Sequence, residues 1–262
     1  MLRPLLVTAL ALSFIASAQA QAQTQAPGTP AIPAAATAPT KAALAPFIAS
    51  YQVSRSGNSL GEATMQVVRQ PASRWRVDLT MRGTGVFKLA GINAQQSTVF
   101  DTVGETYRPL SQATVRKTLF TNKTTTGVYD WAASSARWQG DVKDSRRRPL
   151  PLQAGDMSGL LINLAVIRDA QPGGSLHYRF VDDGRVREHH YLVADELENI
   201  AVGELSYNAM RVTRVESPQA QAAGEETVIW VAKGVPTPIR MLQREGGEDI
   251  FDLRLVEYQG VQ

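Results

Sequence analysis

The chain has 262 residues, a formal net charge of +3 and no cysteine. It is long enough for one ordinary hydrophobic core, and the lack of cysteine excludes disulfides and thiolate metal sites. The small net charge creates no strong basic field, so we expect no nucleic-acid partner.

The first 20 residues have the pattern of a cleavable signal peptide. Arg3 precedes an apolar run from Leu5 to Ile15, and Ala18-Gln19-Ala20 is a typical cleavage site. The run is shorter than the ~20 residues that a transmembrane helix needs. We therefore predict export of the mature chain to the periplasm, with no transmembrane segment in it.

Residues 21–46 consist almost entirely of Ala, Pro, Gln and Thr. Such a segment buries too little apolar surface to offset the entropy that ordering would cost. The predicted organisation is therefore a signal peptide (1–20), a disordered tether (21–46) and a single β-rich domain (47–262).

Within the domain, apolar and polar residues alternate along one segment after another, as they do in half-buried strands. In RWRVDLTMRG (74–83), Trp75, Val77, Leu79 and Met81 point to one side and polar residues to the other. Short turns between such segments favour an antiparallel meander. Further strands are predicted at 49–55, 60–69, 96–103, 110–118, 124–131, 175–182, 186–196, 209–216, 227–233 and 250–258.

One helix interrupts this pattern, at about 156–169. Asp156 is a suitable N-cap, and Met157, Leu160, Leu161 and Leu164 form one apolar stripe. Gly159 costs ~1 kcal/mol relative to alanine inside a helix, which indicates close packing at this position. The sequence thus predicts a mainly β fold: a strongly curved antiparallel sheet, or a partly closed β-barrel, with one packed α-helix.

The segment TVIWVA (227–232) is apolar on both faces, so we expect both faces to be covered. The cover is either the rest of a packed core or a bound ligand. We predict that Val228, Trp230 and Ala232, together with Trp75, line a ligand cavity.

Three consecutive arginines, Arg146, Arg147 and Arg148, lie before Pro149. They form either a solvated loop or a contact for the anionic groups of lipids or polymers.

The sequence indicates no catalytic residue, no metal site and no cofactor. Ser158 lies in Gly-Asp-Met-Ser-Gly, which lacks the Gly-x-Ser-x-Gly spacing of a hydrolase elbow. His189 and His190 are adjacent in a predicted strand and so face opposite sides. His177 completes no ligand motif with them.

The C-terminal half resembles domain of unknown function 3108, a family of exported and mostly periplasmic bacterial proteins. RFVDDGRVREHHYLVADELE, the start of the helix at Gly155-Asp156-Met157-Ser158, and ETVIWVAKGVPTPIRMLQREGGEDIFDLRL carry the resemblance. Its most specific element is the Trp230 strand followed by Gly234–Arg240. The resemblance implies a β-rich fold outside the cytoplasm, similar to curved-sheet periplasmic carriers of lipoproteins and lipids, and no established activity.

Two classes of function follow from these features. The first is a non-catalytic binding or carrier module for a lipid-like or other amphiphilic ligand. The alternative is a structural or assembly factor of the cell envelope that acts through contacts with another protein. An envelope hydrolase is a weaker third hypothesis, because no convergent set of titratable groups supports it. The oligomeric state stays open.

Overall fold

Fourteen strands and a few short helices make up the part of the chain that the computed structural model describes, residues 43–85, 93–118 and 120–261. The predicted signal peptide (1–20) and nearly all of the predicted tether (21–46) lie outside the described residues. A compact unit covers residues 41–262. Among the described residues, no helix has the length and apolar character needed to cross a membrane.

The strands are β1 (Phe47–Arg55), β2 (Asn58–Gln70), β3 (Arg74–Gly83), β4 (Asn93–Val103), β5 (Thr106–Lys117), β6 (Asn122–Asp130), β7 (Ser135–Gly140), β8 (Leu150–Pro151), β9 (Ser175–Asp182), β10 (Arg185–Val202), β11 (Leu205–Arg214), β12 (Glu226–Ala232), β13 (Arg240–Glu245) and β14 (Glu248–Gly260). The helices are the 3₁₀-helices η1 (Asp144–Arg146) and η2 (Gly159–Leu161) and the α-helices α2 (Ile162–Asp169) and α3 (Pro218–Ala222).

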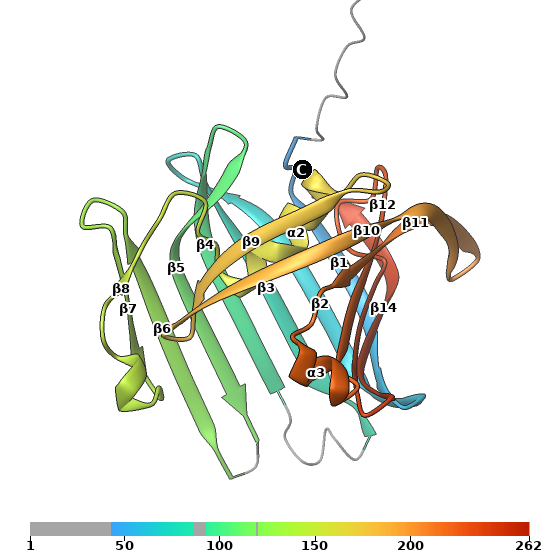
Figure 1. Cartoon of the computed structure of the whole chain (residues 1–262), viewed down its shortest axis with the longest axis horizontal. Helices are drawn as coiled ribbons and strands as arrows, with labels where there is room; N and C mark the ends of the chain where they lie inside the picture. Colours follow the sequence, from blue (N-terminus) through green and yellow to red (C-terminus); the bar gives the residue numbers. More distant parts are fainter. Residues whose placement is uncertain (1–42, 86–92, 119, 262) are drawn as a thin grey trace, which may run out of the picture. The chain divides into compact units, whose positions relative to one another are not determined.

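All strands belong to one antiparallel sheet whose first and last strands pair in its middle. The order is β8-β7-β6-β5-β4-β3-β2-β1-β14-β13-β12-β11-β10-β9. One arm of the sheet therefore runs from β1 to β8 and the other from β14 back to β9. The arms curl toward each other with η2 and α2 between them, and β9 and β10 pass in front of the first arm in Figure 1. The predicted fold, a strongly curved antiparallel sheet or partly closed β-barrel with one packed α-helix, is confirmed, and the sheet is nearly closed.

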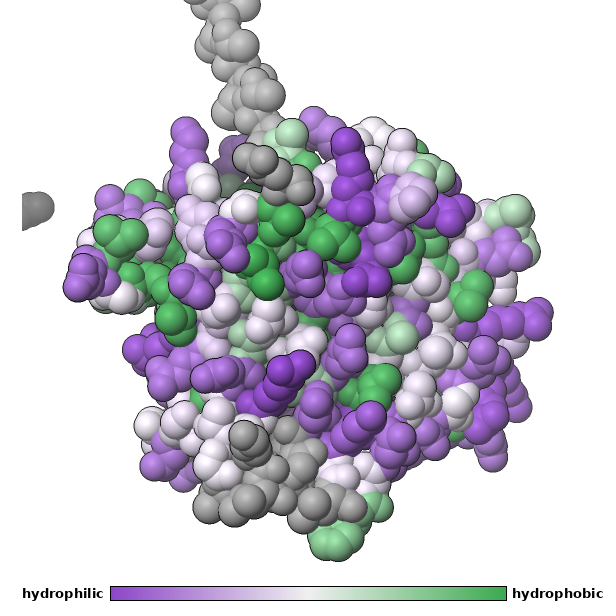
Figure 2. Space-filling model, turned by 180° about the vertical axis from the view of Figure 1, so that it is seen from behind, coloured by the Kyte–Doolittle hydropathy of each residue, from purple (hydrophilic) through white to green (hydrophobic). Residues whose placement is uncertain are grey.

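The alternation in the sequence separates the inside of the sheet from the outside. On β1, Phe47, Ala49, Tyr51 and Val53 are buried inside the curve. On β3, Trp75 and Val77 are buried, and Arg74 and Arg82 are exposed. On the face that Figure 2 shows, hydrophobic residues gather in several separate groups with hydrophilic residues between them, as on an ordinary solvated surface.

The segment between β12 and β13 fills one part of the interior. Val235, Thr237 and Ile239 are buried, and the Tyr51 hydroxyl makes a hydrogen bond with the Thr237 hydroxyl and donates another to the Pro238 carbonyl at 2.9 Å. Burial raises the pKa of Tyr51, which keeps it protonated as a donor. The proline-rich GVPTPIR element therefore has a structural role in the core.

The two ends of the sheet, β8 and β9, do not pair with each other. The outer edge of β9 pairs with Met157 instead: the Met157 amide donates to Arg179 O and the Val181 amide to Met157 O, both at 3.0 Å. A small hydrophobic cluster that includes Tyr129, Trp138 and Val181 joins the two arms at this seam.

Polar side chains complete the seam. The Tyr129 hydroxyl lies 2.6 Å from both Gln112 Oε1 and Val181 O, and the Gln112 amide donates to Asp182. The Gly159 amide donates to the second Asp182 oxygen at 2.8 Å. Side chains from β5, β6 and β9 therefore close the barrel where backbone pairing stops.

The helical segment begins at Gly159, as 3₁₀-helix, and becomes α-helix at Ile162, whereas the predicted start was Asp156. Asp156 does not cap it, because its buried carboxylate binds Arg179 of β9 at 2.5 Å and accepts the Gln153 amide at 2.8 Å. The ion pair fastens this segment to the edge of β9. The predicted apolar stripe lies buried inside the sheet at Met157, Leu160, Leu161 and Leu164.

Gly159→Ala tests the seam. A Cβ atom at Gly159 would lie 2.4 Å from Asp182 Oδ2, so Asp182 would have to move away from the amide that it accepts. We expect a loss of ~1–3 kcal/mol in the free energy of unfolding, the usual cost of leaving a hydrogen-bonding group without its partner. Urea denaturation measures it.

Gly260→Ala is the matched control, since nothing lies within 4 Å of a Cβ atom there. Its effect should stay within ~0.5 kcal/mol. Equal stabilities for the two variants would contradict the role of the Gly159–Asp182 contact.

A candidate ligand cavity inside the sheet

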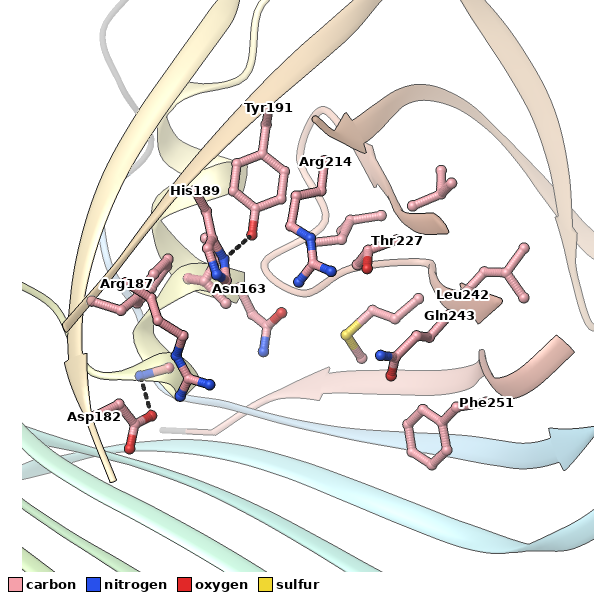
Figure 3. A pocket seen from close by; sticks show the side chains of 16 residues that line it. Asn163, Asp182, Arg187, His189, Tyr191, Arg214, Thr227, Leu242, Gln243 and Phe251 are labelled. Carbon is pink, nitrogen blue, oxygen red and sulfur yellow. Dashed lines mark hydrogen bonds between the residues drawn. The ribbon is translucent and has the colours of Figure 1, made fainter. Parts of the chain in front are cut away.

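A cavity of about 280 Å³ lies between the helical segment and the arm β9–β14. Every strand of that arm contributes to its wall, as do η2 and α2 (Figure 3). The lining residues are Gly159, Ile162, Asn163, Phe180, Asp182, Arg187, His189, Tyr191, Arg214, Thr227, Val228, Ile229, Met241, Leu242, Gln243 and Phe251.

The wall combines apolar and polar side chains. Phe180, Ile229 and Phe251 belong to the apolar part, which comes from several strands. The guanidinium groups of Arg187 and Arg214 point toward the middle of the cavity, as do the amides of Asn163 and Gln243 (Figure 3). Arg187 and Gln243 are exposed, so the cavity opens to solvent beside them. The cavity wall therefore offers both apolar and polar surface.

His189 and Tyr191 lie next to each other on the cavity side of β10. The His189 Nδ1 atom lies 3.2 Å from the Tyr191 hydroxyl. Burial, and after it the positive charges of Arg214 and Arg187, lower the pKa of His189 to about 4. Burial raises the pKa of Tyr191. Both side chains are therefore uncharged at neutral pH.

The two arginines of the cavity differ in their partners. Arg214 donates to Glu216 at 2.6 Å. For Arg187, no carboxylate of the described part of the chain lies within ion-pair distance. Of the two guanidinium groups in the cavity, that of Arg187 is therefore the one without an ion-pair partner among the described residues.

Two polar groups of the wall also lack partners. The Thr227 hydroxyl is buried without a hydrogen bond. The Asn163 side chain is only 7% exposed, and its amide makes no hydrogen bond to the described residues that surround it. Buried polar groups are normally hydrogen-bonded, so each of these has capacity for a ligand or water.

The predicted ligand-lining residues lie in different places. Val228 is part of the cavity wall, whereas Trp230, Ala232 and Trp75 are buried elsewhere in the main core. The Trp230 indole donates to Glu198 at 2.6 Å and lies under the Arg240 guanidinium, 4.9 Å from the ring centre. Both faces of the Trp230 strand are covered, as the sequence predicted. Around Trp230 the cover consists of protein groups.

The three predicted anion-binding arginines lie on the loop that contains η1, and none of them lines the cavity. Arg146 donates to Asp183 at 2.7 Å. Arg147 pairs with Asp144 at 3.1 Å and donates to the Gly140 carbonyl at 3.1 Å. Arg148 is exposed. Contact of this loop with anionic groups stays a prediction.

The residues considered for catalysis do not converge. Ser158 is buried, and its hydroxyl shares a hydrogen bond with Thr98 at 3.0 Å. His177 stacks on His190 outside the cavity, with ring centres 4.1 Å apart, while His189 lines the cavity. Among the described residues, no group of three or more His, Asp or Glu side chains is placed to hold a metal ion.

Sequence reasoning did not identify the polar wall of the cavity. Arg187, His189 and Tyr191 alternate along VREHHYL, so their shared face is visible in the sequence. The alternation alone does not predict that this polar face of the strand points into the sheet. Asn163 carries a weaker signal, as the one amide within an apolar helix.

A profile of the family described as "Protein of unknown function (DUF3108)" matches residues 50–249. The chain belongs to this family. No curated protein sequence matches it.

Two solved structures are similar to this member of DUF3108. One is a β-barrel-like protein of domain of unknown function DUF1849 from Brucella abortus, with a TM-score of 0.52, 11% identity, and coverage of 84% of this chain and 99% of that chain. The other is a DUF1089 family protein from Pseudomonas aeruginosa, with a TM-score of 0.35, 11% identity, and coverage of 68% and 87%. At this identity the Brucella protein supports the barrel-like fold alone.

The titration of His189 tests the electrostatics of the cavity. Its pKa should be about 4, below the 6.5 of an unperturbed histidine. As the pH falls, the unfolded chain takes up this proton first, so the stability that the neutral ring contributes is lost between about pH 6.5 and about pH 4. NMR of the histidine ring measures the pKa.

In Arg187→Ala the pKa of His189 should rise, because one of the charges that lower it is gone. Arg137→Ala removes an equal charge from an exposed position on β7 and should leave the pKa of His189 unchanged. An unperturbed pKa in the wild-type protein would contradict the buried position of the ring.

Proposed function

We propose that this DUF3108 protein is a periplasmic, non-catalytic binding or carrier module for a lipid-like or other amphiphilic small molecule. The observation that carries the proposal is the cavity, which joins apolar walls to polar groups without partners. Small-molecule sites typically combine a mostly apolar lining with a few polar groups that orient the ligand. At about 280 Å³, the cavity suits a small ligand.

The periplasmic part of the proposal rests on the sequence. The first 20 residues have the charge, apolar run and small-residue cleavage site of an export signal. A chain without cysteine is also compatible with an oxidising compartment, since it needs no disulfide pairing there.

An alternative is a structural or assembly factor of the envelope that contacts another protein. The β10–β11 hairpin favours it, because Leu197 and Leu205 are 54% and 64% exposed. The sheet edges favour it less: Met157 occupies the edge of β9, and β8 is only two residues long. The hairpin is therefore the surface on which this alternative depends.

Native mass spectrometry of the purified mature protein tests the binding function. We expect a co-purifying small molecule that organic extraction removes. Met241→Trp should reduce its amount several-fold, because the larger side chain occupies part of the cavity wall.

Met81→Trp is the control, since Met81 is also a half-buried strand methionine but does not line the cavity. If Met241→Trp retains as much of the bound molecule as Met81→Trp does, the molecule binds outside this cavity. The assembly-factor alternative is favoured if no small molecule can be extracted and if Leu205→Asp abolishes the capture of a partner protein that the wild-type protein captures.

A further inference from the structure

We propose that the ligand of this cavity carries a single carboxylate, and that its chemical class is a short or medium-length fatty acid. The inference rests on the proposed function and adds the chemistry of the head group. It follows from the donors that converge in the cavity, from the balance of charges around it and from its size.

Three donors without partners among the described residues lie on the cavity wall. The Asn163 amide from α2, the Thr227 hydroxyl from β12 and the Arg187 guanidinium from β10 lie around one space. A carboxylate accepts several hydrogen bonds at once and is the group that a guanidinium matches in shape. An alcohol or a quaternary ammonium would leave most of these donors unused.

The charges around the cavity favour a head group with one negative charge over one with two. The cavity has two guanidinium groups, and Asp182 and the Glu216 partner of Arg214 supply two carboxylates nearby. Asp182 is bound by the Gly159 and Gln112 amides, which are neutral and do not offset its charge. Arg187 has no carboxylate of the described residues within ion-pair distance, so it can pair directly with one anionic group, whereas Asp182 and Glu216 would repel a dianionic phosphate more strongly than a carboxylate.

The apolar wall receives the tail. Ile162, Phe180, Ile229, Met241 and Phe251 surround the same space as the donors. A volume of about 280 Å³ lies just below the ~300–1,000 Å³ range of small-molecule pockets, which favours a short acyl chain over a long one.

Isothermal titration calorimetry with four probes, each with a chain of eight carbons counting the carboxyl carbon, tests the head group: octanoate, octyl phosphate, 1-octanol and octyltrimethylammonium. We expect octanoate to bind at least about 10-fold more tightly than 1-octanol, in line with a charge-assisted hydrogen bond. Octyl phosphate should bind more weakly than octanoate at a pH where it is dianionic.

Arg187→Gln and Asn163→Leu should each remove most of the preference for octanoate over 1-octanol. Arg187 is exposed, so its replacement keeps the fold, and Asn163→Leu nearly preserves the side-chain volume. Arg137→Gln, which removes a charge outside the cavity, should leave the preference unchanged.

Equal binding of octanoate and 1-octanol, insensitive to Arg187→Gln, would overturn the carboxylate inference and leave the binding function intact. Tighter binding of octyl phosphate would overturn the preference for one charge. An equal loss in Arg137→Gln would show long-range attraction in place of direct pairing and would also overturn the inference. If no probe binds and no molecule co-purifies, the proposed function fails together with it.

Discussion

The fold depends on how the sheet closes. An antiparallel sheet leaves unpaired backbone groups at each edge strand, and these groups need partners when they are buried. Here β8 and β9 do not meet as neighbouring strands. Met157 pairs with the edge of β9, and Asp182 binds the start of the helical segment and the Gln112 amide. These contacts hold the helix inside the curve and join the two arms.

This mode of closure explains why a cavity exists. On one side of the interior, the GVPTPIR segment and the aromatic residues of β1 fill the space. On the other side, one short helix covers the wide arm β9–β14, and it leaves a space lined by Asn163, Thr227 and Arg187. The Thr227 hydroxyl is buried there without a hydrogen bond, although nearly all buried polar groups of the described residues have a partner. A buried polar group without a hydrogen bond, in an otherwise well-packed interior, is typical of a functional site.

Much of the fold could be predicted because a period-two alternation sets both the strands and their buried faces. β3 and β9 have the predicted bounds, and the helix lies at about the predicted position. The alternation gives no clear strand at β13, in which Leu242 is the one buried residue and Gln243 and Glu245 are exposed. β7 and β8 are short, and their pattern is too weak to separate them from loops. The start of the helix was misplaced because Asp156 forms an ion pair with Arg179, a contact between residues far apart in the sequence.

The candidate site was less predictable than the fold. A strand that is apolar on both faces needs cover on both, but the sequence does not distinguish a ligand from packed protein. At Trp230 the cover is Arg240 and Glu198, and the cavity lies beside Val228, further along the same strand. The polar alternation of Arg187, His189 and Tyr191 looks like a solvent face until the curvature of the sheet turns it inward.

Methyl NMR of methionine-labelled protein during addition of octanoate tests the central claim that this cavity is the ligand site. Met241 lines the cavity, whereas Met65 is buried against Thr237 on the other side of the interior. The account predicts a saturable shift of the Met241 methyl resonance, assigned with Met241→Leu, and an unchanged Met65 resonance. A Met241 resonance that stays in place while octanoate binds would contradict it.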